Sequence, residues 1–87
     1  MKRVYKYRIE DVDDLSIPLP LGAEVLTVQM QDGYPNIWVL VDPDDDVIRV
    51  RHFRLAGTGH DIGEKIEKYI GTFQMMNGSL VFHLFEV

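Results

Sequence analysis

The amino-acid sequence predicts a mainly β fold, in which an antiparallel meander forms a small sandwich or barrel. Two observations predict this class. Apolar residues recur mainly at every second position, and turn-forming residues separate the apolar runs. A chain of 87 residues has room for one hydrophobic core, so we expect a single domain over residues 1–87. At most one short helix is expected, and only after Gly63.

The N-terminal half contains three predicted strands and one extended connection. Residues 4–9 alternate apolar and basic side chains, which predicts a first strand with one wet face. Residues 16–22 carry two prolines that cannot donate to a sheet ladder, so we expect an extended connection along an edge. Strands at 24–31 and 36–42 follow, joined by a hairpin loop at 32–35.

The strand at 24–31 is predicted to have one polar face and one apolar face. The expected polar side carries Val25, Thr27, Gln29 and Gln31, and the opposite side carries Leu26, Val28 and Met30.

The C-terminal half begins with a strand at 47–55. Its apolar residues change face halfway along, so we expect a β-bulge near Arg51 and His52. A long loop at 56–63 and one or two helical turns at 64–68 should follow. Strands at 69–75 and 80–87 then form a closing hairpin.

Two segments, residues 37–41 and 80–87, are apolar on both faces of the predicted strand. A second sheet of the same chain could cover them, or a second copy of the protein could. We therefore expect a homo-oligomer as one of the partners of this chain.

Charge and composition exclude several classes of function. The net charge of −5 opposes binding to bulk nucleic acid or to an anionic membrane. The absence of cysteine excludes thiolate chemistry and disulfides. No signal peptide or membrane-spanning segment is recognisable, which favours a cytoplasmic location.

The strongest candidate site is a cationic strand that leads into a glycine-rich loop. Arginine offers a planar fork of donors for phosphate or carboxylate, and a glycine-rich turn can direct several backbone N–H groups at one anion. The alternative is a solvated strand face followed by an ordinary loop. The candidate ligand-binding residues are Arg51, Arg54, Gly57, Thr58, Gly59 and His60, with Tyr34 as an exposed aromatic contact.

Aromatic residues elsewhere could stack on a base, namely Trp38 and Tyr69. For Trp38, which lies inside an apolar run, a role in the core is favoured. His83 is expected to be a hydrogen-bonded core or interface histidine.

Catalytic and metal-binding patterns are missing from the sequence. The serines Ser16 and Ser79 lie in no nucleophile elbow. A calcium loop starting at Asp42 fails, because its sixth position is Val47 where glycine is required. We expect no enzymatic activity, no cofactor and no metal.

The chain resembles a small β-rich family of domains of unknown function that phages and bacterial genomes carry. The resemblance rests on residues 38–43, 53–60, 69–74 and 80–86, and its most specific parts are the Gly57 to His60 loop and the Leu80 to His83 string. It implies no catalytic residues. It implies a viral or prophage context, in which small oligomers often block host defence and some sequester nucleotide signals intact.

We therefore expect a non-enzymatic protein that binds and sequesters a small anionic ligand, a cyclic or linear nucleotide, in a counter-defence role. The alternative is a protein-interaction module that occludes a host protein through exposed apolar strands.

Overall fold

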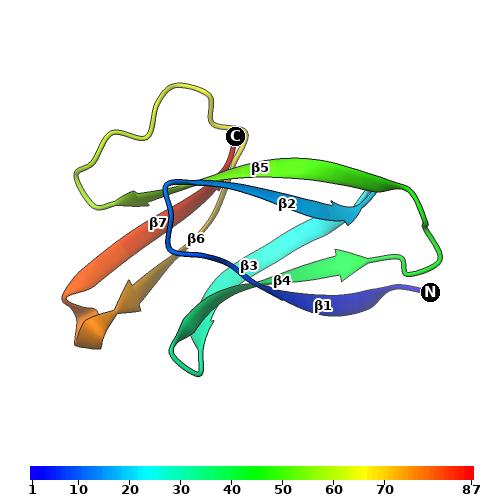
Figure 1. Cartoon of the computed structure of the whole chain (residues 1–87), viewed down its shortest axis with the longest axis horizontal. Coiled ribbons are helices and arrows are strands. Elements are labelled where there is room, and N and C mark those ends of the chain that lie inside the picture. Colours follow the sequence, from blue (N-terminus) through cyan, green and yellow to red (C-terminus); the bar gives the residue numbers. More distant parts are fainter.

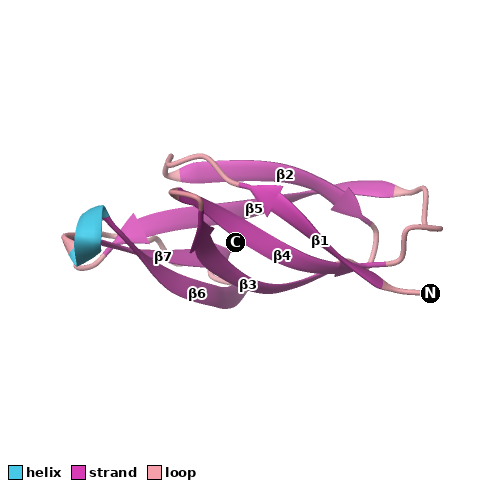
Figure 2. Ribbon diagram, turned by 90° about the horizontal axis from the view of Figure 1, so that it is seen from below, coloured by secondary structure: helices cyan, strands magenta, loops and turns pink.

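Two antiparallel sheets face each other in the computed structural model, which describes residues 1–87. The strand order is β1-β4-β3 in the three-stranded sheet, here called sheet A, and β2-β5-β7-β6 in the four-stranded sheet, here called sheet B (Figure 1). The strands are β1 (Arg3–Arg8), β2 (Asp14–Pro20), β3 (Glu24–Gln31), β4 (Tyr34–Val41), β5 (Ile48–Gly57), β6 (Lys68–Met75) and β7 (Leu80–Glu86). The predicted mainly β class is confirmed, and the form is an open sandwich (Figure 2).

The core lies between the sheets, where the alternation of each strand delivers every second side chain. From β4, the central strand of sheet A, Ile37, Val39 and Val41 point inward and are buried. From sheet B, Phe53 and Leu84 meet them and are equally buried. The second sheet of the same chain thus covers the inner face of both strands that are apolar on two sides.

One edge of the sandwich is closed by a close approach of β6 to β3. A Cβ atom added at Gly71 of β6 would lie 2.9 Å from Cγ1 of Val28 and 3.6 Å from its backbone nitrogen. Ile70 bulges out of the β6–β7 pairing next to this point, and its side chain is buried. The glycine therefore lets the backbones of the two sheets meet at this edge.

The segment at 16–22 is more regular than predicted. Its edge position is confirmed, but Asp14–Pro20 forms a true strand that pairs with β5 along its whole length. Only one side of an edge strand donates to the ladder, so Pro18 and Pro20 are tolerated there.

The predicted face assignment in β3 is wrong at its start. A register shift between Val25 and Thr27 turns Leu26 outward, where it is 45% exposed, and buries both Val25 and Val28. A bulge has this effect because it adds one residue against a single partner.

The bulge predicted near Arg51 and His52 is absent. The pairing of β5 with β2 runs without a shift from Arg54 opposite Asp14 to Ile48 opposite Pro20. The apolar residues change face because the first half of β5 leaves Ile48 and Val50 exposed on the outer surface. The strand therefore needs no register break, because Ile48 and Val50 are not buried.

The helical turns predicted at 64–68 are also absent. This stretch is irregular up to Lys68, where β6 starts, and the backbone nitrogen of Glu67 donates to the carbonyl of Glu86. The sole helical element is a 3-10 turn at Met76–Gly78, in the connection from β6 to β7. No segment forms a helix of the length and apolarity that crossing a bilayer requires.

Candidate functional site

The two arginines of the predicted ligand site lie on opposite faces of β5. Because β5 has no bulge, Arg51 alternates inward with Phe53 and Leu55, whereas Arg54 points outward. The two side chains therefore do not converge on one anion. The predicted bulge would have placed both arginines on one face, but β5 has no such bulge.

Arg51 is already paired within the protein. Its Nε donates to Oε2 of Glu86 at 2.7 Å, and its Nη2 donates to Oε1 of Glu86 at 2.8 Å. Its Nη1 donates to the backbone carbonyl of Ala23, which joins sheet B to the chain entering sheet A. The hydrogen bond from Arg51 lowers the pKa of Glu86 and outweighs the opposing effect of burial. Arg51 thus has a structural role in which its charge is neutralised.

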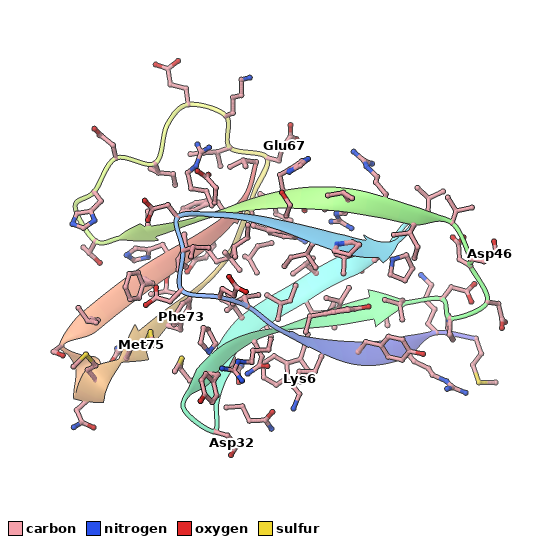
Figure 3. The ribbon with its side chains drawn as sticks, viewed as in Figure 1. Lys6, Asp32, Asp46, Glu67, Phe73 and Met75 are labelled. Atoms are coloured by element: carbon pink, nitrogen blue, oxygen red, sulfur yellow. The ribbon has the colours of Figure 1, made fainter.

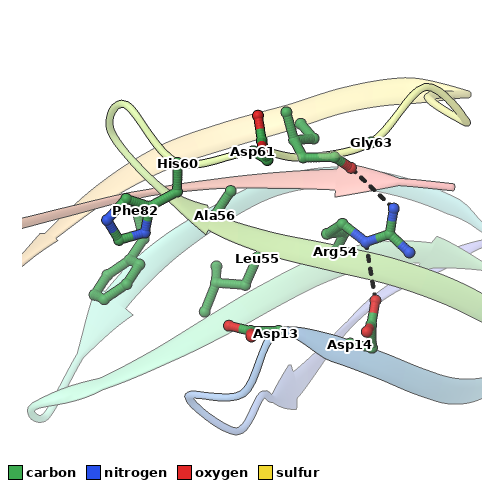
Figure 4. Close-up of a pocket in the computed structure, with 11 residues that line it drawn as sticks. Asp13, Asp14, Arg54, Leu55, Ala56, His60, Asp61, Gly63 and Phe82 are labelled. Atoms are coloured by element: carbon green, nitrogen blue, oxygen red, sulfur yellow. Dashed lines mark hydrogen bonds and ion pairs between the residues drawn. The ribbon is translucent and has the colours of Figure 1, made fainter.

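Arg54 is paired on the outer face of sheet B. Its Nε donates to Oδ1 of Asp14 at 2.9 Å, and its Nη1 donates to the carbonyl of Ile62 at 2.9 Å (Figure 4). It lines a cavity of about 410 Å³ whose other charged groups include the carboxylates of Asp13, Asp14 and Asp61. These carboxylates work against an anionic ligand in this cavity.

The glycine-rich loop is largely held by its own contacts. The ring of His60 packs over Gly57, so that a Cβ there would lie 3.1 Å from Nδ1. The backbone nitrogen of His60 donates to the carbonyl of Gly57, and that of Thr58 donates to the carbonyl of Val81. Gly59 supplies the positive φ of the turn. The N–H groups of Thr58 and His60 are therefore not free to cradle an anion.

Thr58 belongs to a chain of hydroxyl and imidazole contacts. Its Oγ1 lies 2.7 Å from Nε2 of His83, and Oγ1 of Thr72 lies 2.9 Å from Nδ1 of the same ring. The hydroxyl of Tyr69 lies 2.5 Å from Thr72 Oγ1. The prediction that His83 is hydrogen-bonded is confirmed, but the ring is not part of the core, so a core position is wrong for it.

The seventh predicted residue, Tyr34, lies far from this loop, on the outer face of sheet A. It is 47% exposed at the start of β4, as predicted. The guanidinium carbon of Arg8 lies 3.3 Å from the centroid of its ring. The structure thus groups Tyr34 with β1 and separates it from Arg51, Arg54 and the glycine-rich loop.

The outer face of sheet A gathers cations, amides and aromatic rings on neighbouring strands. The register places Lys6 opposite Trp38 and Arg8 opposite Asn36, and β3 adds Gln29 opposite Asn36. Trp38 is half-buried on this face and is not part of the core, so the core interpretation is wrong. We call this surface the cationic face, and its residues are Lys6, Arg8, Gln29, Gln31, Tyr34, Asn36 and Trp38.

Lys6 and Arg8 form no ion pair, in contrast to Arg51 and Arg54. The Nζ of Lys6 donates to Oε1 of Gln31 at 2.6 Å, and Arg8 rests on Tyr34. Figure 3 shows the Lys6 side chain extending away from the sandwich, on the side of the turn that carries Asp32. Both side chains are exposed, so each can exchange its present contact for a ligand.

A shallow cavity of about 340 Å³ lies at the Tyr34 end of this surface and does not reach Trp38. Lys6, Arg8, Tyr34 and Asn36 contribute to its lining, and Asp32 is its one carboxylate. Cations therefore outnumber carboxylates here, whereas the reverse holds around Arg54.

Signals for the cationic face are present in the sequence. The alternation of 4–9 predicts that Lys6 and Arg8 share a wet face, and the pattern of 24–31 places Gln29 and Gln31 together. What the sequence does not reveal is that β1 and β3 flank the same strand, β4.

The fold and this surface define a class: a small two-sheet β-sandwich with an open polar sheet face. The chain belongs to the family described as a domain of unknown function (DUF7352), whose model matches residues 1–87. No curated protein and no solved structure matches the chain.

Proposed function

We propose that the protein is a non-enzymatic binding protein for a small anionic, nucleotide-derived ligand, and that the ligand binds to the cationic face. The observation that supports this assignment is the pair Lys6 and Arg8. They are exposed on one face, lack any carboxylate partner and lie beside aromatic rings.

The chemistry of the face suits a nucleotide. Exposed cations bind phosphate oxygens, and the guanidinium of Arg8 is already positioned over the ring of Tyr34, so less freedom is lost when it binds. Amide side chains can hydrogen-bond to base edges, and aromatic or guanidinium planes can stack on a base. All of these groups bind and orient a ligand without breaking its bonds.

The biological setting is part of the proposal. In a phage or prophage, a protein of this kind would sequester a nucleotide signal of the host in the cytoplasm and keep it intact. Such a counter-defence role needs a bound ligand and no catalysis.

The first test is a thermal-shift screen of cyclic and linear nucleotides against the intact chain. A ligand that binds the folded state raises its unfolding temperature. Lys6→Gln and Arg8→Gln should each reduce the shift, whereas Lys65→Gln, an exposed charge in the irregular stretch before β6, should not. The proposal fails if no nucleotide raises the unfolding temperature, or if all three variants behave alike.

A second candidate function is favoured by an exposed apolar patch on the outer face of sheet B, at the start of β5. Ile48 and Val50 are 57% and 52% exposed, and they lie opposite Pro20 and Pro18 of the edge strand β2. This patch would serve self-association or the occlusion of a host protein. Light scattering at micromolar concentration tests the first: an oligomer that Val50→Asp turns into a folded monomer supports it, and a monomeric parent protein removes it.

A further inference from the structure

We infer that the ligand of the cationic face is a dinucleotide, linear or cyclic, whose two nucleotide units are each held by one cation and one ring. This inference rests on the proposed function and specifies its ligand. Three observations support it: the distance between Lys6 and Arg8, the aromatic ring beside each of them, and the charged residues at the two ends of β1.

The spacing of the two cations defines two phosphate positions. Lys6 and Arg8 are alternate residues of one strand, so their attachment points lie about 7 Å apart on the same face. Both are exposed, and neither is neutralised by a carboxylate. A nucleoside monophosphate carries a single phosphate and leaves one of these cations without a partner.

Each cation has its own aromatic neighbour on β4. Lys6 lies opposite Trp38, and Arg8 lies against the ring of Tyr34. Four residues of strand, roughly 13 Å, separate Trp38 from Tyr34. Two bound bases would therefore be splayed apart, one toward Trp38 and one toward the Arg8 guanidinium that covers the Tyr34 ring, and would not stack on one another.

The amide groups lie where splayed bases would present their edges. Gln31 is opposite Tyr34, and Gln29 is opposite Asn36, midway between the two rings. Gln31 now accepts from Lys6 Nζ at 2.6 Å, and a phosphate on Lys6 would release this amide for a base.

Carboxylates follow the cationic pair at the C-terminal end of β1, where Glu10 and Asp11 come closely after Arg8 in the chain. At the other end, Lys2 and Arg3 add two cations, but Arg3 lies opposite Val41, which Asp42 and the acidic turn at 44–46 follow. The carboxylates of that turn offset these two cations, so the third and fourth phosphates of a longer strand should add little affinity.

The single tryptophan provides the measurement, because a base that stacks on Trp38 changes its fluorescence. The intact protein is titrated, in an adenine and in a guanine series, with the 5′-monophosphate, the 5′-phosphorylated linear dinucleotide, the cyclic dinucleotide and the linear tetranucleotide. We expect one or both dinucleotides to bind at least about tenfold more tightly than the monophosphate. The tetranucleotide should gain no more than the threefold that its three overlapping registers provide.

Salt dependence counts the phosphates that are neutralised. Because a dinucleotide places two phosphates on two cations, log K should fall more steeply with log salt for the dinucleotides than for the monophosphate. Lys6→Gln and Arg8→Gln should each make this salt dependence shallower and bring dinucleotide affinity close to that of the monophosphate. Lys65→Gln should leave the salt dependence and the affinity unchanged, and circular dichroism should show the same fold in all variants.

The outcomes separate the inference from the proposed function. Equal affinity for monophosphate and dinucleotides, with loss in the Arg8→Gln variant, would overturn the inference and leave the proposed function standing. A tetranucleotide that binds more than about tenfold more tightly than the dinucleotides would also overturn it, in favour of an extended nucleic-acid surface. Absence of binding by every compound would remove the proposed function and the inference together.

Discussion

Arg51 and Glu86 form a two-point ion pair between β5 and β7, with Nε and Nη2 of the arginine on the two carboxylate oxygens at 2.7 and 2.8 Å. Each side chain is 16% exposed, so the pair is largely withdrawn from water. The arginine also donates to the carbonyl of Ala23, so the pair connects the two sheets. A charge in this position must keep its partner, because a lone buried charge is costly.

The stability of the protein should therefore depend on Glu86 and on pH. Glu86→Gln is expected to reduce the free energy of unfolding at pH 7 by about 1–3 kcal/mol, because Arg51 loses its counter-charge. Contact with Arg51 holds the pKa of Glu86 below its ordinary value, so this stabilisation is present above the ordinary value of 4.5 and is lost as pH falls through the folded-state pKa. Urea unfolding at pH 7 and at pH 3 measures both effects.

The difference in stability between the parent protein and Glu86→Gln should shrink as pH falls below about 4. Other carboxylates titrate in both proteins and cancel in this difference. Glu64→Gln, an exposed glutamate in the loop before β6, should change stability by about 0.5 kcal/mol or less. A pH-independent difference would contradict the role assigned to the ion pair.

Most of the strands could be predicted because alternation is a local pattern. A spacing of two between apolar residues, bounded by glycine and proline turns, locates β3, β4, β6 and β7 to within a few residues. The prediction of which face a residue occupies is wrong where contacts with distant parts of the chain determine that face. Leu26 turns outward because of its pairing with β4, and Ile48 stays outside because β5 extends beyond the core.

The candidate site was harder to predict, because its charges are decided by tertiary contacts. Arginines in the sequence look alike, but Arg51 meets Glu86 from 35 residues away and Arg54 meets Asp14 from 40 residues away. Lys6 and Arg8 meet no carboxylate. The wet face of the first strand could be predicted, but its importance emerges only once Arg51 and Arg54, the cations of the predicted site, are seen to be paired.

A second prediction concerns the edge where β6 meets β3. Gly71→Ala places a Cβ about 2.9 Å from Cγ1 of the buried Val28, so one of them must move. Overpacking of this kind should reduce the free energy of unfolding by about 1–3 kcal/mol. Urea unfolding measures it.

A double-mutant cycle gives the control. In a Val28→Ala background the clashing methyl group is gone, so Gly71→Ala should cost at least about 0.5 kcal/mol less than in the parent protein. Equal costs in the two backgrounds would show that the glycine is needed for another reason than this contact.

The last prediction concerns Arg54, which connects the long loop to the outer face of sheet B. Its contact with the Ile62 carbonyl holds the middle of the loop against β5, and its contact with Asp14 Oδ1 fixes the guanidinium to the neighbouring strand β2. Gly63 supports this arrangement, because its φ is +83° and a Cβ there would lie 2.8 Å from Nη1 of Arg54. Arg54→Gln should therefore loosen the loop while leaving the sandwich intact.

Hydrogen exchange measures this loosening at the amides of His60 and Glu67, which bound the loop and donate to the carbonyls of Gly57 and Glu86. We expect their exchange to become at least about tenfold faster in Arg54→Gln, with global stability reduced by about 1 kcal/mol or less, because the ion pair is exposed. Arg49→Gln, which removes an exposed arginine of the same strand, should leave both amides unchanged. If Arg54 instead belonged to an anion site, the variant would lose nucleotide binding; on the assignment made here, binding at the cationic face is retained and only the loop responds.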